Sequence, residues 1–357
     1  MVNSQLKTLE TIGAILSFKS DPHLLKITLQ KEHFNWDALV TIGSRHLVLP
    51  AMYCRLKEKQ LLHCLPEDLV LYLEEITAIN RNRNLGILKE VTAISELFNK
   101  HQIDHVFLKG SALLAGNYYQ DIGERMIGDI DVLVASNQLD EAYELLLKED
   151  YKSNVSFGDK YFEYQHLPRL AKKTVLAAVE IHRNVLKRKY FNCLIVNEIF
   201  IKKRIINGIS IPNDQHLFEH NILNLQLNDQ GNYLVFVNLR TAYDTELILK
   251  ENSTIDFNFY YSKGLFKNYF LLHPFLIKDF NNIPSTTITN KLYLAFYIFK
   301  TKHRWFNIIW NKIFFFVDLV TFLVAHFWFF ISNKKYRTDL IKERKHFYKK
   351  LKIQFFR

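Results

Sequence analysis

The sequence predicts an α/β fold, in which a small mixed-sheet core is flanked by helical regions on both sides. Apolar residues recur at helical spacing through the first hundred residues and again from about residue 214. Between these regions lie short apolar runs interrupted by glycine or by single acids, which is typical of strands. Only 11 Gly and 7 Pro occur in 357 residues, which argues against a loop-rich sandwich. An apolar content of 48% is enough for a packed core and excludes a largely disordered chain.

Residues 1–100 are predicted to form an N-terminal helical subdomain. The segment Glu67–Lys100 has a helical period that only the polar stretch Asn80–Asn84 interrupts. An earlier helical face is marked by residues spaced three or four apart, namely Leu6, Leu9, Ile12 and Leu16.

Residues 101–213 are predicted to form the catalytic core. His105–Leu108 is interpreted as a buried strand that a glycine turn at Lys109–Gly110 ends. Ser111–Tyr119 is predicted to be a helix, and Ile130–Val134 a second strand.

The remainder of the core repeats this alternation. Asn137–Lys148 is predicted to be a helix with Ser136 or Asn137 as its N-cap. Val175–Ile181 is an apolar run that predicts a third strand. Two further units are predicted, a helical subdomain at 214–300 and an apolar helix with a basic C-terminal tail at 301–357.

Three acids in the core predict a metal site. Side chains alternate along a strand, so Asp129 and Asp131 should face the same side. Two unpaired carboxylates are costly to bury but suit divalent cations, which prefer oxygen ligands. Glu180 is the only acid within the apolar run 175–181, and on a neighbouring strand it would supply a third carboxylate.

The preceding turn predicts the phosphate half of the site. Gly110 would let the backbone approach a phosphate, and Ser111 would add a hydroxyl at the start of a helix, where N–H groups are free. Lys109 and Arg125 are the nearest cations for a triphosphate. With two Mg²⁺ (or Mn²⁺) ions, such a site could activate an acceptor hydroxyl and stabilise a pyrophosphate leaving group.

These motifs resemble the uncharacterised bacterial nucleotidyltransferase family of the polymerase-β-like superfamily. The resemblance is strongest over 106–134, in Phe107–Leu113 and Arg125–Val134, and it continues in Val179–His182. It extends outwards to two helical segments, and so covers about residues 30–250, through His46–Pro50 and Leu239–Asp244.

The resemblance implies roles for individual residues. Gly110 and Ser111 would contact the nucleotide phosphates, while Asp129, Asp131 and Glu180 would bind metal. The chain departs from the superfamily in that 17 residues separate Ser111 from Asp129, a longer connection than usual, with an insert at about 117–123. Beyond about residue 300 the family offers no counterpart.

Several residues also allow a structural interpretation. Lys109 could simply cap the strand edge, and Glu180 could pair with Arg183. Arg125 could pair with Glu124 or Asp121.

Three histidines and Asp244 can likewise be interpreted either as site residues or as structural residues. His182 should share the face of Glu180, where a structural hydrogen bond is the favoured role. His216 and His220 are one helical turn apart and favour a satisfied helix face over a metal site. Asp244 is expected to pair with Arg240 one turn away on the same helix.

The C-terminal region carries most of the net charge. From 332 to 357 there are ten Lys or Arg residues and two acids, a net charge of +8 out of +11 for the chain. The apolar stretch 313–331 has the length of a membrane span, but Asp318 within it favours a buried or interfacial helix. The basic tail could hold an anionic membrane surface or a nucleic acid, or be a solvated helix end.

The predicted activity is Mg²⁺-dependent transfer of a nucleoside monophosphate from an NTP such as ATP to a hydroxyl acceptor. The acceptor could be a small molecule or glycan precursor, an RNA or a protein. The alternative is a catalytically silent, nucleotide-binding module at the membrane periphery. Three cysteines without CxxC spacing and an N-terminus without a leader pattern predict a cytoplasmic protein, membrane-peripheral through 313–357.

Overall fold

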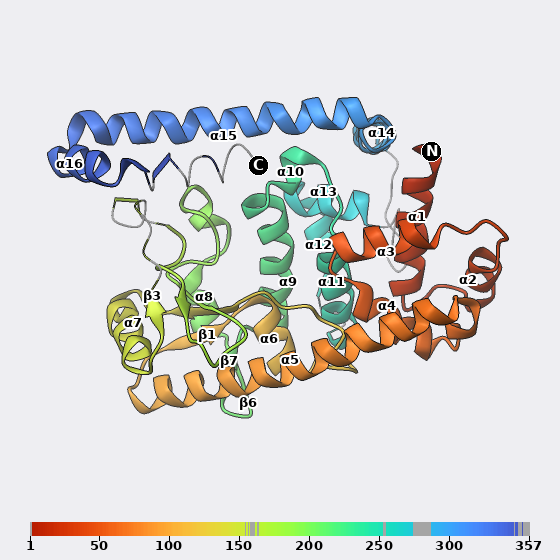
Figure 1. Ribbon diagram of the computed structural model, residues 1–357, viewed down its shortest axis with the longest axis horizontal. Coiled ribbons are helices and arrows are strands. Elements are labelled where there is room, and N and C mark those ends of the chain that lie inside the picture. The colour runs from red at the N-terminus through yellow and green to blue at the C-terminus, as the bar shows by residue number, and fades with distance from the viewer. Residues whose placement is uncertain are drawn as a thin grey trace.

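The computed structural model describes residues 2–153, 155, 157, 161–162, 164–252, 255–273, 287–345, 347–348 and 352. Within them a small mixed sheet lies among many helices, as the sequence predicts (Figure 1). The part of the predicted basic tail that begins at residue 353 lies outside the described residues.

Five helices form the predicted N-terminal region. They are α1 (Val2–Leu16), α2 (Pro22–Leu29), α3 (Trp36–Arg45), α4 (Leu49–Glu58) and α5 (Glu67–Lys100). The Asn35 side chain caps α3 by accepting from the Ala38 N–H.

The long helix α5 runs without the predicted interruption at Asn80–Asn84. Asn80 and Asn84 lie on the buried stripe of the helix, in the same register as Leu73, Ile87 and Val91. Their side chains remain polar in the core because they donate to backbone carbonyls of residues 122–125, so the helix continues through them.

The core sheet has the order β1-β2-β5-β4-β3. Its strands are β1 (His105–Phe107), β2 (Ile130–Val134), β3 (Lys152–Ser153), β4 (Leu170–Ala171) and β5 (Val179–His182). β2 is parallel to β5, and the other pairs are antiparallel. The sequence predicts β1, β2 and β5, whereas the two-residue strands β3 and β4 were not predicted.

Two helices of the core follow its strands. Helix α6 (Lys109–Ala115) packs between β2 and α5. The predicted helix after β2 begins with a 3₁₀ turn, Ser136–Gln138, and α7 then runs over Leu139–Lys148. The predicted capping by Ser136 or Asn137 is wrong, because Gln138 occupies the N-cap and no side chain makes the capping bond.

The hairpin and helices after the sheet complete the body. They are α8 (Val196–Ile201), β6 (Arg204–Ile206), β7 (Ile209–Ile211), α9 (Asp214–Leu223), a π-helical turn Asn224–Asn228, α10 (Gly231–Leu234), α11 (Leu239–Glu251), α12 (Phe257–Ser262) and α13 (Gly264–Leu272). Helix α14 (Ile288–Lys302) returns to pack against α1, so the region 214–300 contacts the N-terminal helices.

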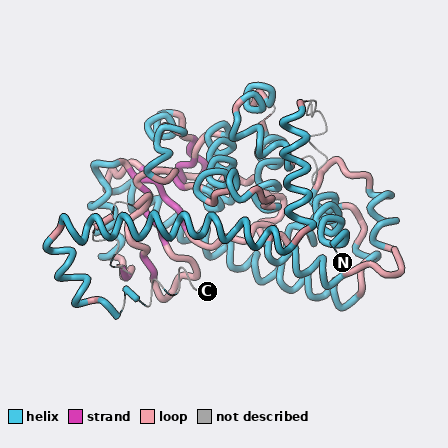
Figure 2. Tube along the Cα trace, turned by 90° about the horizontal axis from the view of Figure 1, so that it is seen from above, coloured by secondary structure: helices cyan, strands magenta, loops and turns pink. Residues whose placement is uncertain are grey.

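The last two helices are α15 (Arg304–Ser332) and α16 (Lys334–Lys342). Helix α15 lies along one side of the molecule, over most of its length, and α16 turns back from its end (Figures 1 and 2). By length and composition α15 could cross a membrane, with a mean hydropathy of 2.1 over its most apolar window. The interpretation of this segment as a buried helix is wrong, since only 6% of that window is buried.

Candidate active site

The predicted metal ligands converge because β2 and β5 are parallel neighbours. Their register places Asp131 opposite Glu180 and Leu133 opposite His182. Residues opposite one another on adjacent strands point to the same face, so the two carboxylates lie side by side. Ligand atoms of Asp131, Glu180 and His182 all lie within 4.8 Å of one another, close enough to hold one ion.

Asp131 is the buried centre of this cluster. One of its oxygens accepts from Lys109 Nζ at 2.7 Å and from His182 Nε2 at 2.8 Å. Burial alone would raise the pKa of Asp131, but the Lys109 ammonium and the His182 ring hold it well below its usual range. Asp131 is therefore a carboxylate anion with positive groups already gathered around it.

His182 has the hydrogen-bonding role that its position predicts. It is fully buried, and burial would lower its pKa, but hydrogen bonds to Asp131 and Glu180 raise it instead. Its Nε2 lies 3.7 Å from Glu180 Oε2, so the ring bridges the two acids. The same nitrogen is a candidate metal ligand, which the sequence analysis did not assign.

Arg169 is a site residue that the sequence analysis missed. Its guanidinium pairs with Asp129 and, through Nε at 3.3 Å, with Glu180. It precedes β4, a two-residue strand, and no local motif marks it. Glu180 therefore pairs with Arg169, not with Arg183 as one interpretation had it.

Asp129 stands slightly apart from the other acids. It precedes β2, and its side chain is 28% exposed, against 9% for Asp131. Burial, together with the nearby charges of Glu180 and Asp131, raises its pKa despite Arg169. Asp129 is thus joined to Glu180 through Arg169, at the open edge of the cluster.

The turn that carries Lys109 differs from the predicted glycine turn. The residue in the left-handed region is Lys109 itself, with φ 51°, and Gly110 already lies in α6. A non-glycine residue held there costs about 1–3 kcal/mol, and such strain gathers at functional sites. The conformation directs the lysine side chain to Asp131.

Gly110 is required by close packing. A Cβ at this position would lie 2.9 Å from Ile127 Cγ1. Ser111, next to it, is fully buried, and its hydroxyl has no hydrogen-bond partner in the structure. A buried hydroxyl without a partner is costly, so it fits a residue whose partner arrives with a ligand.

Arg125, predicted to meet a triphosphate, has another partner. Its guanidinium pairs with Asp244 at 2.8 Å, and both side chains are buried. Tyr119 donates to the same carboxylate at 2.6 Å. The expected pairs of Arg125 with Glu124 or Asp121, and of Asp244 with Arg240, are therefore wrong, because Asp244 joins α11 to the loop before β2.

A narrow cavity of about 60 Å³ opens beside Lys109. Its lining includes Arg125, His220, Asp229 and Arg240. His220 is fully buried, and its Nε2 forms a hydrogen bond with the Val185 carbonyl at 3.2 Å. Burial lowers the pKa of His220 to about 3. His220 is therefore a satisfied helix-face histidine, as the sequence favours, whereas the buried Nδ1 of His216 has no hydrogen-bond partner among the described residues.

A family model described as an uncharacterised nucleotidyltransferase matches residues 32–262, more than half of the chain. The chain belongs to this family. The resemblance drawn from the sequence is thereby confirmed, and the mixed sheet with flanking helices agrees with an α+β nucleotidyltransferase fold. A comparison with curated proteins gave no match.

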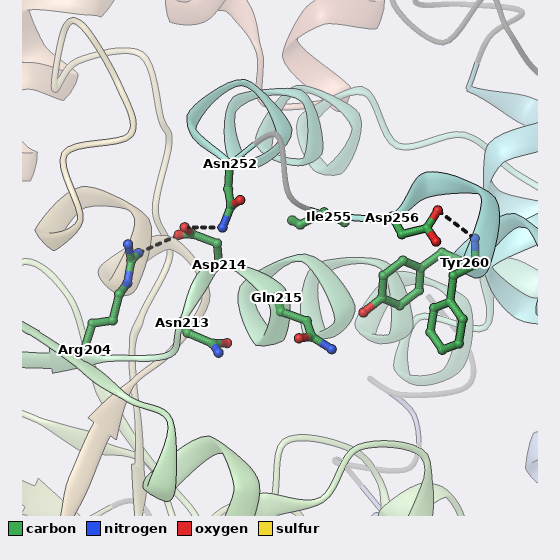
Figure 3. Close-up of a pocket in the computed structure, with 9 residues that line it drawn as sticks. Arg204, Asn213, Asp214, Gln215, Asn252, Ile255, Asp256 and Tyr260 are labelled. Atoms are coloured by element: carbon green, nitrogen blue, oxygen red, sulfur yellow. Dashed lines mark hydrogen bonds and ion pairs between the residues drawn. The ribbon is translucent and has the colours of Figure 1, made fainter.

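A larger polar pocket of about 450 Å³ lies away from the acids of this nucleotidyltransferase (Figure 3). Asp214 at the start of α9 pairs with Arg204 at 2.6 Å and accepts from Asn252 at 2.9 Å. These polar groups pair with one another by an ion pair and a hydrogen bond. This side of the pocket therefore lacks the convergent charges found around Asp131.

Proposed function

We propose that this nucleotidyltransferase moves a nucleoside monophosphate from an NTP to a hydroxyl acceptor, with divalent metal held by Asp129, Asp131 and Glu180. The observation that carries the proposal is the pairing of Asp131 with Glu180 across parallel strands, with His182 closing the group. Small-molecule, glycan-precursor, RNA and protein acceptors all fit a site of this kind.

The donor set fits a hard divalent cation. Carboxylate oxygens are the ligands that Mg²⁺ and Mn²⁺ prefer. Lys109 and Arg169 now supply the positive charge that the three acids need. Bound metal would lower the pKa of the acceptor hydroxyl and neutralise charge on the leaving pyrophosphate.

The residues of the chain itself would do the remaining work. The first turn of α6 has N–H groups without helical partners, and Gly110 leaves no side chain between its backbone and Ile127. The Ser111 hydroxyl lacks an acceptor that a phosphate oxygen would provide. Lys109 and Arg169, freed from the carboxylates, are positioned to pair with the triphosphate.

His182 would orient Asp131. Its Nδ1 lies 3.4 Å from both Gln165 Nε2 and the Asn184 carbonyl, contacts that hold the ring from the other side. Arg125 is placed differently, since its pair with Asp244 makes it a support for the loop before Asp129.

The test is transfer of α-³²P label from each of the four NTPs into cell extract by the purified full chain, with Mg²⁺ or Mn²⁺. The Asp129→Asn/Asp131→Asn double variant should lose at least about 10³-fold in rate, because the metal ligands lose their charge. The control is Asp37→Asn/Asp140→Asn, which neutralises two exposed acids in first turns of α3 and α7 and should transfer normally.

Metal binding separates this proposal from its alternative, a nucleotide-binding module without turnover. Calorimetry with Mn²⁺ and NTP should show binding that the Asp129/Asp131 variant loses. Metal-dependent binding without transfer to any extract fraction would favour the silent module. The enzyme assignment of this site would be overturned if the chain showed no transfer and also no metal-dependent NTP binding.

A further inference from the structure

We propose that α15 lies in the plane of an anionic membrane surface, with its outward apolar face in the acyl boundary. This inference does not depend on the proposed chemistry. It names a binding surface, the exposed face of α15, and one partner, a bilayer rich in anionic lipid.

The outward face of α15 is predominantly apolar along the helix, although it includes Lys312. Large hydrophobic side chains remain 39–68% exposed from one end to the other, which is far more than single exposed residues on a soluble surface. They are Trp305, Ile308, Ile309, Ile313, Phe315, Phe316, Val317, Val320, Leu323, Val324, Phe327, Trp328, Phe330 and Ile331.

The inward face of α15 meets the body through aromatic contacts, such as Phe314 on Tyr233, and through two hydrogen bonds. Asp318, the acid that argued against a membrane span, accepts from Gln230 Nε2 at 2.8 Å. Trp310 donates its indole N–H to the Tyr233 carbonyl at 3.0 Å. The helix therefore has one side for the protein and one side that the described residues leave uncovered, as interfacial helices have.

Both ends of α15 are held by the same body, which favours an in-plane helix over a spanning one. Near the start lies the Trp310–Tyr233 contact, and near the end Phe329 packs on Phe162 with ring centres 4.8 Å apart. Helix α16 then turns back, and Tyr161 donates to Asp339 at 2.5 Å. A spanning helix would place its ends on opposite sides of the bilayer, so these contacts could not coexist.

The basic residues that flank α15 favour an anionic membrane over a second copy of the chain as the partner of this face. Lys302 and Arg304 precede the apolar face, and Lys334, Lys335 and Arg337 follow it. Residues 332–357, which include these last three, carry ten basic side chains against two acids in total. Two copies meeting through this face would bring these basic flanks together, whereas anionic headgroups would neutralise them.

Two exposed tryptophans of α15 lie at positions where helices at a membrane interface commonly carry this residue. Trp305 and Trp328 lie near opposite ends of the helix and are 60% and 68% exposed. Indole rings concentrate at headgroup level, because their ring is apolar and their N–H polar. Lys312, on the outward side, has a stem long enough to carry its ammonium towards the headgroups.

The test is flotation of the purified full chain with vesicles of phosphatidylcholine alone or with added phosphatidylglycerol. The chain should float with the anionic vesicles, less with neutral ones, and alkaline carbonate should release it. Phe316→Glu/Phe327→Glu should lower the partition at least about tenfold, since charged groups replace two apolar side chains that would enter the acyl boundary.

A matched control is Leu71→Glu/Ile79→Glu on α5. These residues are each 60% exposed, close to 63% for Phe316 and 65% for Phe327, and their replacement should leave flotation unchanged. Trp fluorescence should be quenched by lipid brominated at shallow positions, because three of the four Trp residues lie on α15.

Three results would overturn the proposal. Flotation could be the same for the Phe316/Phe327 variant and the wild type. The chain could resist carbonate extraction, which would make α15 a spanning helix. It could instead form a stable dimer that the Phe316/Phe327 substitutions dissociate, without binding vesicles, which would make the face an interface between copies.

Discussion

Asp131 carries more of the proposed site than any neighbouring side chain, because it faces Lys109, Glu180 and His182 together. Its position in a strand, two residues after Asp129, was sufficient to predict the cluster, since strand alternation is local. The pairing with Glu180 was expected from a single acid in an apolar run, and the register confirms the neighbouring strands.

Arg169 allows a test of whether its guanidinium and a divalent metal ion compete for the same carboxylates. Replacing it by Gln removes the cation that bridges Asp129 and Glu180, so the carboxylates should bind a divalent ion more tightly. We expect Mn²⁺ affinity of the free protein to rise severalfold by calorimetry. If Arg169 also meets the triphosphate, KM for the NTP should rise in the same variant.

Lys172→Gln is the control for this change. Lys172 directly follows β4, and its ammonium lies over the Tyr151 ring, so Mn²⁺ affinity should stay at the wild-type value. Weaker Mn²⁺ binding in Arg169→Gln would contradict the idea that the guanidinium and the metal compete for the same carboxylates.

The buried pair of Arg125 and Asp244 makes a prediction about stability. Asp244→Asn leaves the Arg125 charge uncompensated in the interior, where its side chain is 10% exposed. The free energy of unfolding should fall by about 3–5 kcal/mol, measured by urea denaturation. Glu198→Gln, which breaks an exposed pair with Lys202, should leave the urea midpoint unchanged.

Arg125 and Arg169 show why single-residue roles were harder to predict than the acids. Arg125 is separated from Asp244 by more than a hundred residues, and nothing local to either one indicates the pair. Arg169 reaches the site from the position just before β4, a strand of only two residues. Long-range partners depend on tertiary packing, which a periodic pattern does not encode.

At the scale of elements, α5 supports the loop that leads into the metal site. Asn84 is fully buried and donates to the carbonyls of Ile122 and Arg125 at 2.6 and 2.8 Å. Asn84→Leu should lower the free energy of unfolding by about 1–3 kcal/mol, because the Ile122 carbonyl loses its Asn84 donor and the Arg125 carbonyl retains only the Asn80 donor among the described residues. Asn82→Leu, an exposed change on the same helix, should cost little by the same urea measurement.

Helix α14 makes a prediction about pH. Lys300 is 5% exposed, and burial lowers its pKa from 10.5 to about 8. Between these values the unfolded chain binds the proton more tightly, so Lys300 should make stability rise with pH from about 8 to 10.5. The difference in unfolding free energy between wild type and Lys300→Met should change in this window and be flat from pH 5 to 7.

The hairpin β6–β7 was predictable and was missed. Its turn is Asn207–Gly208, with φ 50° and 79°, and Asn-Gly is a strong local signal for a two-residue hairpin. The strands β3 and β4 carry no such signal, being two residues each. The polar stretch Asn80–Asn84 led to the opposite error, because two of its asparagines, Asn80 and Asn84, occupy core positions of a continuous helix.

At the scale of the whole molecule, the family match and the proposed membrane-binding face belong to different parts of the chain. The match ends at residue 262, and α15 begins at Arg304. Length, apolar content and flanking charge predicted an unusual C-terminal helix, but only its low burial separates an interfacial helix from a core one. Burial is a property of the folded molecule, so composition alone left both interpretations open.

This division predicts that the body folds without the C-terminal helices. A chain ending at His303 retains α14 and its capping residue, and loses a helix that buries only 6% of its most apolar window. Its thermal midpoint should stay within a few degrees of the wild type, and its Mn²⁺ affinity should be unchanged, while vesicle flotation is lost.

A chain ending at Thr287 also loses α14, whose Asn290, Tyr297 and Lys300 are buried, and should no longer unfold cooperatively in calorimetry. Loss of cooperative unfolding already at His303 would instead make α15 part of the folding unit, because the body would then need its inward contacts to Gln230 and Tyr233 for stability.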